Sequence, residues 1–281
     1  MTAILLSLTA AVSYGLSDFV GGIASKRAGA WSVALVSLAS GAVAVLGLSA
    51  LTDGAPDASA LWWSVAAGVA NGFGTSFLYR GLSSGRMGVV APISGVGAAL
   101  VPVAVGVATG ERPSALVWIG IVSALPGIWL VSREPVVEDV GGDRPSSSGL
   151  VDGVLAGLGF GGLFAALAQI PEEAGFLPLA LNQVVAVGAI IVLATALRAP
   201  WVPRQRAALL GVISGVLGGL ATGAFLVATQ SGFLTVTAVL ASLYPAFTVI
   251  LAATVLREHV HRYQAVGLLF CAAAVTLVAA G

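Results

Sequence analysis

Charged residues are scarce in this chain of 281 residues, at 9% of the total, whereas soluble globular domains carry about 25%. Hydrophobic residues make up 58%, and the mean hydropathy is +1.03. So few charges do not cover the surface of a water-soluble domain, and the composition therefore excludes that class. The 12 Lys and Arg balance the 12 Asp and Glu, so no basic excess favours binding to nucleic acid.

Cysteine and histidine are also nearly absent. Cys271 is the single cysteine, so no disulfide forms within the chain. His259 and His261 are the only histidines, and two such ligands in one turn without a third are weak evidence for a metal site. We therefore expect neither a metal nor a cofactor.

Long apolar runs, by contrast, take up most of the chain. A helix that crosses a bilayer needs about 20 mostly apolar residues. Ten runs meet this length and leave no room for a soluble domain: 2–25, 31–51, 60–82, 87–109, 114–132, 150–170, 176–198, 207–230, 235–256 and 261–280. The sequence therefore predicts an all-α integral membrane protein with ten transmembrane helices in the lipid bilayer.

One stretch, 133–149, differs in composition because it is rich in charged residues, proline and serine. It is typical of a solvated linker, and it separates a first half, 1–132, from a second half, 150–281, with five predicted helices each. Where the similarity is strongest, the halves align without a gap at an offset of 147 residues, which pairs Gly68 with Gly215 and Glu111 with Glu258. We interpret them as two copies of one five-helix repeat.

The distribution of positive charge predicts the orientation of these copies. Eleven of the twelve Lys and Arg lie in the loops that join helices 1–2, 3–4, 5–6, 7–8 and 9–10, or at the adjacent helix ends; only Arg112 lies on the other side. The positive-inside rule then places the linker in the cytoplasm and both termini outside a plasma (inner) membrane. Because five is odd, the second copy enters the membrane upside down. Inverted-topology repeats are typical of transporters.

The last two helices of each half, 88–132 and 232–279, resemble the EamA-type repeat of the drug/metabolite transporter superfamily. The second half carries the pattern as Ser242, Leu243, Tyr244, Pro245 and Glu258, and the first carries Gly110, Glu111 and Arg112. The sequence departs from the pattern at Arg257, where glycine is usual, and the first half lacks the Tyr–Pro pair. The resemblance implies ten helices, a central cavity between the halves, and export or exchange of small metabolites, without implying a particular substrate.

Asp18 is the first candidate for transport chemistry, because we expect it to be the only acidic residue inside a span. A carboxylate near the bilayer centre costs at least about 2.5 kcal/mol, which makes it a functional candidate. Apolar surroundings favour the neutral acid, so Asp18 is also a candidate proton-binding residue, with Tyr14 on the same helix face. A structural ion pair with Arg80, or snorkelling of Arg80 to the interface, would explain the same residues.

Other polar residues within the spans have two interpretations each. Asn71 and Thr75 share one stripe of the third predicted helix, where they contact substrate or form hydrogen bonds between helices. Ser242 and Tyr244 are candidate cavity residues beside Pro245, which predicts a kink that is either a gate or a fixed shape.

Residues near the span ends favour structural roles. Glu111 and Glu258 are predicted to cap helix N-termini rather than to couple transport. Gln169, Asn182 and Gln183 are predicted to contact lipid headgroups or loops.

These patterns favour a secondary transporter of a small metabolite or drug-like solute, an exporter or exchanger that works by alternating access, with protons as a candidate coupling ion. One alternative is an intramembrane enzyme, which needs a recognisable set of nucleophiles, His/Glu metal ligands or paired carboxylates, whereas we expect one Asp and no His within the membrane. Another is a membrane scaffold or sensor that transports nothing. The oligomeric state is left open, and a monomer is compatible with the sequence.

Overall fold

The computed structural model describes residues 1–83, 87–132, 148–257 and 259–281, and these form eleven α-helices and no β-strand. The first half contains α1 (Thr2–Arg27), α2 (Ala30–Ser49), α3 (Ala58–Ser83), α4 (Met87–Ala108) and α5 (Ala115–Ser132). The second half contains α6 (Ser148–Leu167), α7 (Leu177–Ala196), α8 (Gly211–Ser231), α9 (Leu234–Ala241), α10 (Tyr244–Val255) and α11 (Arg262–Ala280). Two short 3-10 helices, η1 (Glu172–Ala174) and η2 (Arg206–Leu210), precede α7 and α8.

Helices suit this sequence because a spanning helix satisfies its backbone hydrogen bonds internally, away from water. Eight helical stretches of the described residues are long and apolar enough to cross a membrane, and α9 and α10 together form one of them. The described apolar part of α4 is shorter, Ile93–Ala108, and α3 is less apolar because it carries Asn71 and several hydroxyl side chains. With these two, the chain has the ten predicted spans, and the predicted fold class is confirmed.

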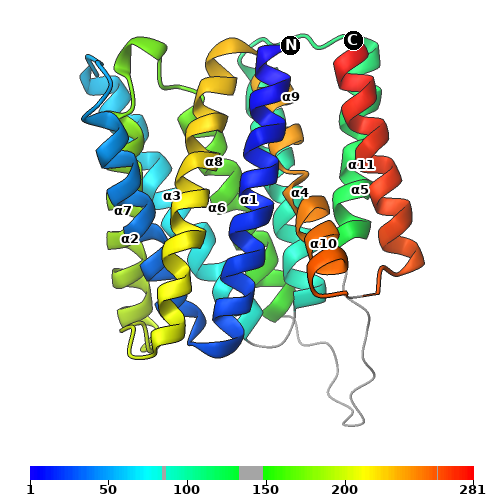
Figure 1. Ribbon diagram of the computed structural model, residues 1–281. Helices are drawn as coiled ribbons and strands as arrows, with labels where there is room; N and C mark the ends of the chain where they lie inside the picture. Colours follow the sequence, from blue (N-terminus) through cyan, green and yellow to red (C-terminus); the bar gives the residue numbers. More distant parts are fainter. Residues whose placement is uncertain (84–86, 133–147, 258) are drawn as a thin grey trace.

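The two halves run in opposite directions through one bundle (Figure 1). Both termini lie at the same end of the bundle, here called the terminus end. At the opposite end, here called the linker end, α5 stops and α6 starts. Since α1 begins at the terminus end and α6 at the linker end, the second five-helix repeat is inverted relative to the first. Residues 133–147 of the predicted linker lie outside the described residues.

Helix packing follows the same symmetry. α3 packs against α6 and α7, and the matching helix of the second half, α8, packs against α1 and α2. In the same way α4 packs against α6, while α9 and α10 pack against α1. α2 pairs with its own counterpart α7, and α5 with α11. The main contacts therefore stay the same when each helix is replaced by its counterpart in the other half. Most of the packing lies between the repeats rather than within them.

The span that contains Pro245 departs from the expected kinked helix. α9 ends at Ala241 and α10 begins at Tyr244, so the helix is interrupted at Ser242 and Leu243. Pro245 occupies the first turn of α10, where backbone N–H groups have no partner within the helix, so its missing N–H costs no hydrogen bond. In the first repeat, by contrast, α4 continues without interruption.

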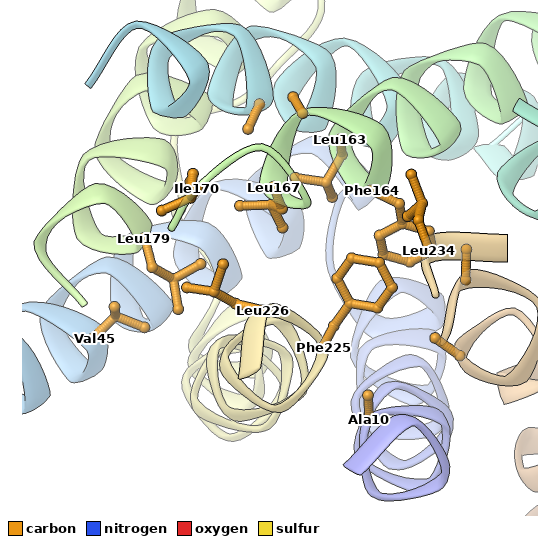
Figure 2. Packing of buried hydrophobic residues seen from close by; sticks show 14 of the residues in the cluster. Ala10, Val45, Leu163, Phe164, Leu167, Ile170, Leu179, Phe225, Leu226 and Leu234 are labelled. Carbon is orange, nitrogen blue, oxygen red and sulfur yellow. The ribbon is translucent and has the colours of Figure 1, made fainter. Parts of the chain in front are cut away.

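A buried apolar cluster lies in the half of the bundle nearer the terminus end. Figure 2 shows how its side chains pack together. The cluster includes Ile170, which follows α6, and Leu179 and Leu234, which lie in the first turns of α7 and α9. Phe164 and Phe225 stack at its centre with 4.3 Å between ring centroids. Because α6 ends and α7 and α9 begin at the terminus end, this cluster closes that end of the space between the repeats.

Candidate functional site

A cavity of about 820 Å³, counting its opening, lies between the two repeats. Its lining comes from both halves: Tyr14, Ser17 and Asp18 of α1; Ala34, Ser37 and Leu38 of α2; Asn71, Thr75 and Leu78 of α3; Ala98 of α4; Phe160, Leu163 and Phe164 of α6; Gln183 of α7; Ser214, Gly215, Gly218, Gly219 and Thr222 of α8; and Tyr244 of α10. The lining residues of α1, α2 and α3 come from the parts of these helices nearer the linker end. The cavity therefore extends from the middle of the bundle toward that end.

The structure brings most of the candidate residues together here. Tyr14, Asp18, Asn71, Thr75 and Tyr244, which come from three helices, all line the cavity. Ser242 is not in the lining. It is fully buried at the break between α9 and α10, and its hydroxyl has no partner among the described residues.

Tyr14 is at the centre of an aromatic group. Its hydroxyl lies 2.9 Å from the Thr222 hydroxyl on α8, which holds the phenol across the interface between the repeats. Its ring centroid is 6.0 Å from that of Phe164 and 6.1 Å from that of Tyr244. Asp18 lies one helical turn further along α1, on the same face and exposed. The carboxylate and the rings therefore face one space.

A close contact between α1 and α10 sets the position of Tyr244. A Cβ added at Gly15 would lie 2.7 Å from the Cβ of Phe247 and 2.9 Å from the carbonyl oxygen of Tyr244. The Thr248 hydroxyl donates to the Gly15 carbonyl oxygen at 3.2 Å. Glycine at residue 15 thus allows the backbone approach that places the first turn of α10 beside Tyr14.

Serines on three helices form a polar cluster near Asp18 that the sequence analysis missed. The Ser17 hydroxyl donates to the Ser214 carbonyl oxygen at 2.8 Å, and the Ser214 hydroxyl donates to the Ser17 carbonyl oxygen at 2.9 Å. The Ser37 hydroxyl donates to the Ser214 hydroxyl at 3.1 Å. These bonds join α1, α2 and α8. Serines are common in this sequence, so no pattern singled them out.

Two amide side chains line the cavity from α3 and α7. Asn71 donates to Gln183 at 3.5 Å, and Thr75 donates to Asn71 at 3.4 Å. These bonds are long, so both amides have capacity left for a ligand. The expectation that Asn182 and Gln183 contact headgroups or loops is wrong, because both are buried. Gly68 of α3 packs against the Asn182 backbone, and Asn71 of α3 donates to the Gln183 side chain.

Arg80 forms an ion pair with Asp152 of α6, not with Asp18. Its Nε atom lies 2.9 Å from Asp152 Oδ1, and its guanidinium carbon is 4.4 Å from the centroid of the Phe77 ring. Asp152 lies within the spanning stretch Gly149–Leu167 and within the predicted run 150–170, so the expectation that Asp18 is the only acidic residue inside a span is wrong. Among the described residues this is the only ion pair.

Glu111 joins the two repeats at the terminus end. Its two carboxylate oxygens accept hydrogen bonds from the backbone N–H groups of Leu234 (2.5 Å) and Thr235 (2.9 Å), at the start of α9. Gly106 leaves room for this carboxylate, since a Cβ there would lie 2.5 Å from Glu111 Oε2. This geometry is that of a helix cap. Glu258, its counterpart in the second repeat, lies outside the described residues.

We expect the Glu111→Gln variant to lose about 1–2 kcal/mol of unfolding free energy and to keep its affinity for substrate. Glutamine has one acceptor oxygen for two N–H donors, and it removes a negative charge from the positive end of α9. Denaturation of the purified protein in detergent measures the first effect, and ligand titration measures the second. A well-folded Glu111→Gln protein without transport would instead place Glu111 in the mechanism.

Comparisons with known proteins were made for both sequence and fold. A model of the EamA-like transporter family matches residues 1–133 and 147–280, which together take in both five-helix repeats. A protein of known crystal structure has the same fold, with a TM-score of 0.72 at 16% sequence identity over 99% of this chain and 98% of that chain. At this identity the likeness concerns the fold alone. No curated protein matches the sequence.

Proposed function

The chain belongs to the EamA-like transporter family, and from this premise we propose that it is a secondary transporter that exports or exchanges a small organic solute by alternating access. The observation that carries the proposal is the cavity between two inverted repeats, lined by both of them. In inverted-repeat transporters one site at the repeat interface opens alternately to the two sides, because each repeat can adopt the conformation of the other.

The conformation of the bundle is consistent with one half of such a cycle. The cavity extends from the middle of the bundle toward the linker end, while the apolar cluster around Phe164 and Phe225 occupies the half nearer the terminus end. With the linker in the cytoplasm of a plasma (inner) membrane, as the positive charges favour, this is an inward-facing state. Transport then requires the apolar cluster to part while the cavity closes at the linker end.

This orientation has a direct test by cysteine labelling. In a Cys271→Ala background, we expect Thr2→Cys and Gly281→Cys to react with an impermeant thiol reagent in intact cells. Glu138→Cys is expected to react only after the cells are opened. Labelling of residue 138 in intact cells would contradict both the orientation and the inward-facing assignment.

Proton coupling is the second part of the proposal, and Asp18 is the residue that supports it. Asp18 is exposed to the cavity and has no ion-pair partner among the described residues. A carboxylate that reaches an aqueous cavity from within a span is suited to bind and release a proton. Arg80, which the sequence offered as an alternative partner of Asp18, forms an ion pair with Asp152 instead.

Solute flux in proteoliposomes tests the proposed function. The purified chain is reconstituted and screened against amino acids, nucleosides, sugars and organic cations, with empty liposomes as the control. Saturable, protein-dependent flux of one class is the expected result. No flux for any class, together with chemical conversion of a solute, would favour a membrane enzyme; no flux and no conversion would favour a scaffold or sensor.

A further inference from the structure

We infer that the cavity binds an organic cation, a solute in which a protonated amine or quaternary ammonium is attached to an apolar or aromatic body. This inference rests on the proposed function, because it takes the cavity as the substrate site. It follows from the charge of the cavity lining, from the aromatic rings beside that charge, and from the hydrogen-bonding groups around both.

Within the described residues, the charge of the cavity lining has one sign. Asp18 is the only charged residue among those that line the cavity in the described part of the chain, and no lysine, arginine or histidine accompanies it. Arg80 lies two residues beyond the lining residue Leu78, but Asp152 neutralises its guanidinium. Among the described lining residues, an anion would face the Asp18 carboxylate with no cation to balance it, whereas a cation would pair with Asp18. The lining thus selects against anions as well as for cations.

The aromatic rings favour the same kind of solute. Tyr14, Phe164 and Tyr244 form a connected group with centroid separations of 6.0 and 6.1 Å, and Phe160 also lines the cavity. Aromatic faces attract ammonium groups within about 6 Å of the ring centroid, and they also pack against an apolar body. Because Asp18 lies one turn from Tyr14, a cation that pairs with the carboxylate also lies beside the ring.

The remaining polar groups suit the uncharged part of a ligand. Asn71 and Gln183 hold each other through a 3.5 Å hydrogen bond and have donors and acceptors to spare. The Ser17 and Ser214 hydroxyls each donate to the other residue's carbonyl oxygen, so they shape the cavity wall more than they bind a ligand. The ionised form of Asp18 binds the cation and its protonated form does not. The cation and the proton therefore compete for the same carboxylate, so Asp18 can take part in both substrate binding and proton coupling.

Four probes that share one phenylethyl body test the inference: phenethylamine (cation), phenethyl alcohol (neutral), 3-phenylpropionate (anion) and phenylalanine (zwitterion). Binding to the purified full-length protein in lipid nanodiscs is measured by calorimetry at neutral pH, where the amine is protonated. We expect phenethylamine to bind about tenfold more tightly than the alcohol, and the acid and phenylalanine to bind more weakly than the amine. In Asp18→Asn, the amine and the alcohol should bind within about twofold of each other.

The control removes an exposed carboxylate far from the cavity. Glu172→Gln, in η1 at the terminus end, should keep the full preference for the amine. A second pair of variants tests the ring: Tyr14→Phe should keep most of the preference, and Tyr14→Leu should lose part of it. If Asp18→Asn does not fold, the ranking of the four probes on the wild-type protein and the Tyr14 pair decide the question.

The inference is overturned if phenethylamine does not bind, if phenylalanine or 3-phenylpropionate binds as tightly as the amine, or if Asp18→Asn keeps the preference. These outcomes differ from failure of the proposed function. Selective binding of the amine without any flux in proteoliposomes would refute transport and keep the cation site. Flux of a solute without preference for positive charge would support transport and refute the cation site.

Discussion

The Asp18→Asn variant is expected to lose all solute accumulation driven by a pH gradient, while solute exchange across the membrane continues in part. Asparagine nearly preserves the volume of the side chain, but it cannot take up or release a proton in the cavity. Exchange needs only that the cavity opens to each side with solute bound, so a neutral residue reduces it without stopping it. Uptake of radiolabelled solute into proteoliposomes, with and without an imposed gradient, measures both activities.

Glu172→Gln is the matched control for this variant, since it removes one carboxylate from an exposed position outside the long helices. It should accumulate solute as the wild-type protein does. Full gradient-driven uptake by a well-folded Asp18→Asn protein would eliminate the proton role. The chain would then be better described as a uniporter or an exchanger, because no other carboxylate lines the cavity in the described residues.

Arg80→Gln is expected to have the largest effect on stability, a loss of about 2–4 kcal/mol of unfolding free energy. Asp152 has only 5% of its side chain exposed, so without the guanidinium its charge is left in a buried site. Asp152→Asn should cost less, about 1–2 kcal/mol, because 37% of the Arg80 side chain is exposed and its charge can reach water. Denaturation of purified variants in detergent, followed by circular dichroism, gives both values.

The double variant Arg80→Gln/Asp152→Asn should recover much of the loss, since it leaves neither charge unpaired. A double-mutant cycle between Arg80 and Asp18 should show little coupling energy, because the structure has no ion pair between them. Strong coupling of Arg80 to Asp18 together with none to Asp152 would mean that the ion pair between α3 and α6 is wrongly assigned.

The sequence by itself was sufficient to predict the membrane fold. Apolar runs of spanning length are a local property, so composition and run length predicted the ten spans, although α3 and α4 meet the criteria less clearly than the others. The 147-residue offset and the odd number of helices per copy likewise predicted the inverted repeats. The interruption near Pro245 was predicted as a kink because proline marks the place, whereas α9 and α10 in fact meet there as separate helices.

The partners of individual side chains were decided by the tertiary structure alone. Helical periodicity correctly grouped Tyr14 with Asp18 on α1, but it contains no information about which helix faces them. For that reason it did not predict that Arg80 pairs with Asp152, that Gln183 reaches the cavity, or that Ser17, Ser37 and Ser214 meet. These contacts join residues 72 to 197 positions apart, and they form only when the two inverted repeats pack against each other. The cavity exists because of that packing. Its lining residues come from several helices, so no single segment of the sequence could predict which residues line it.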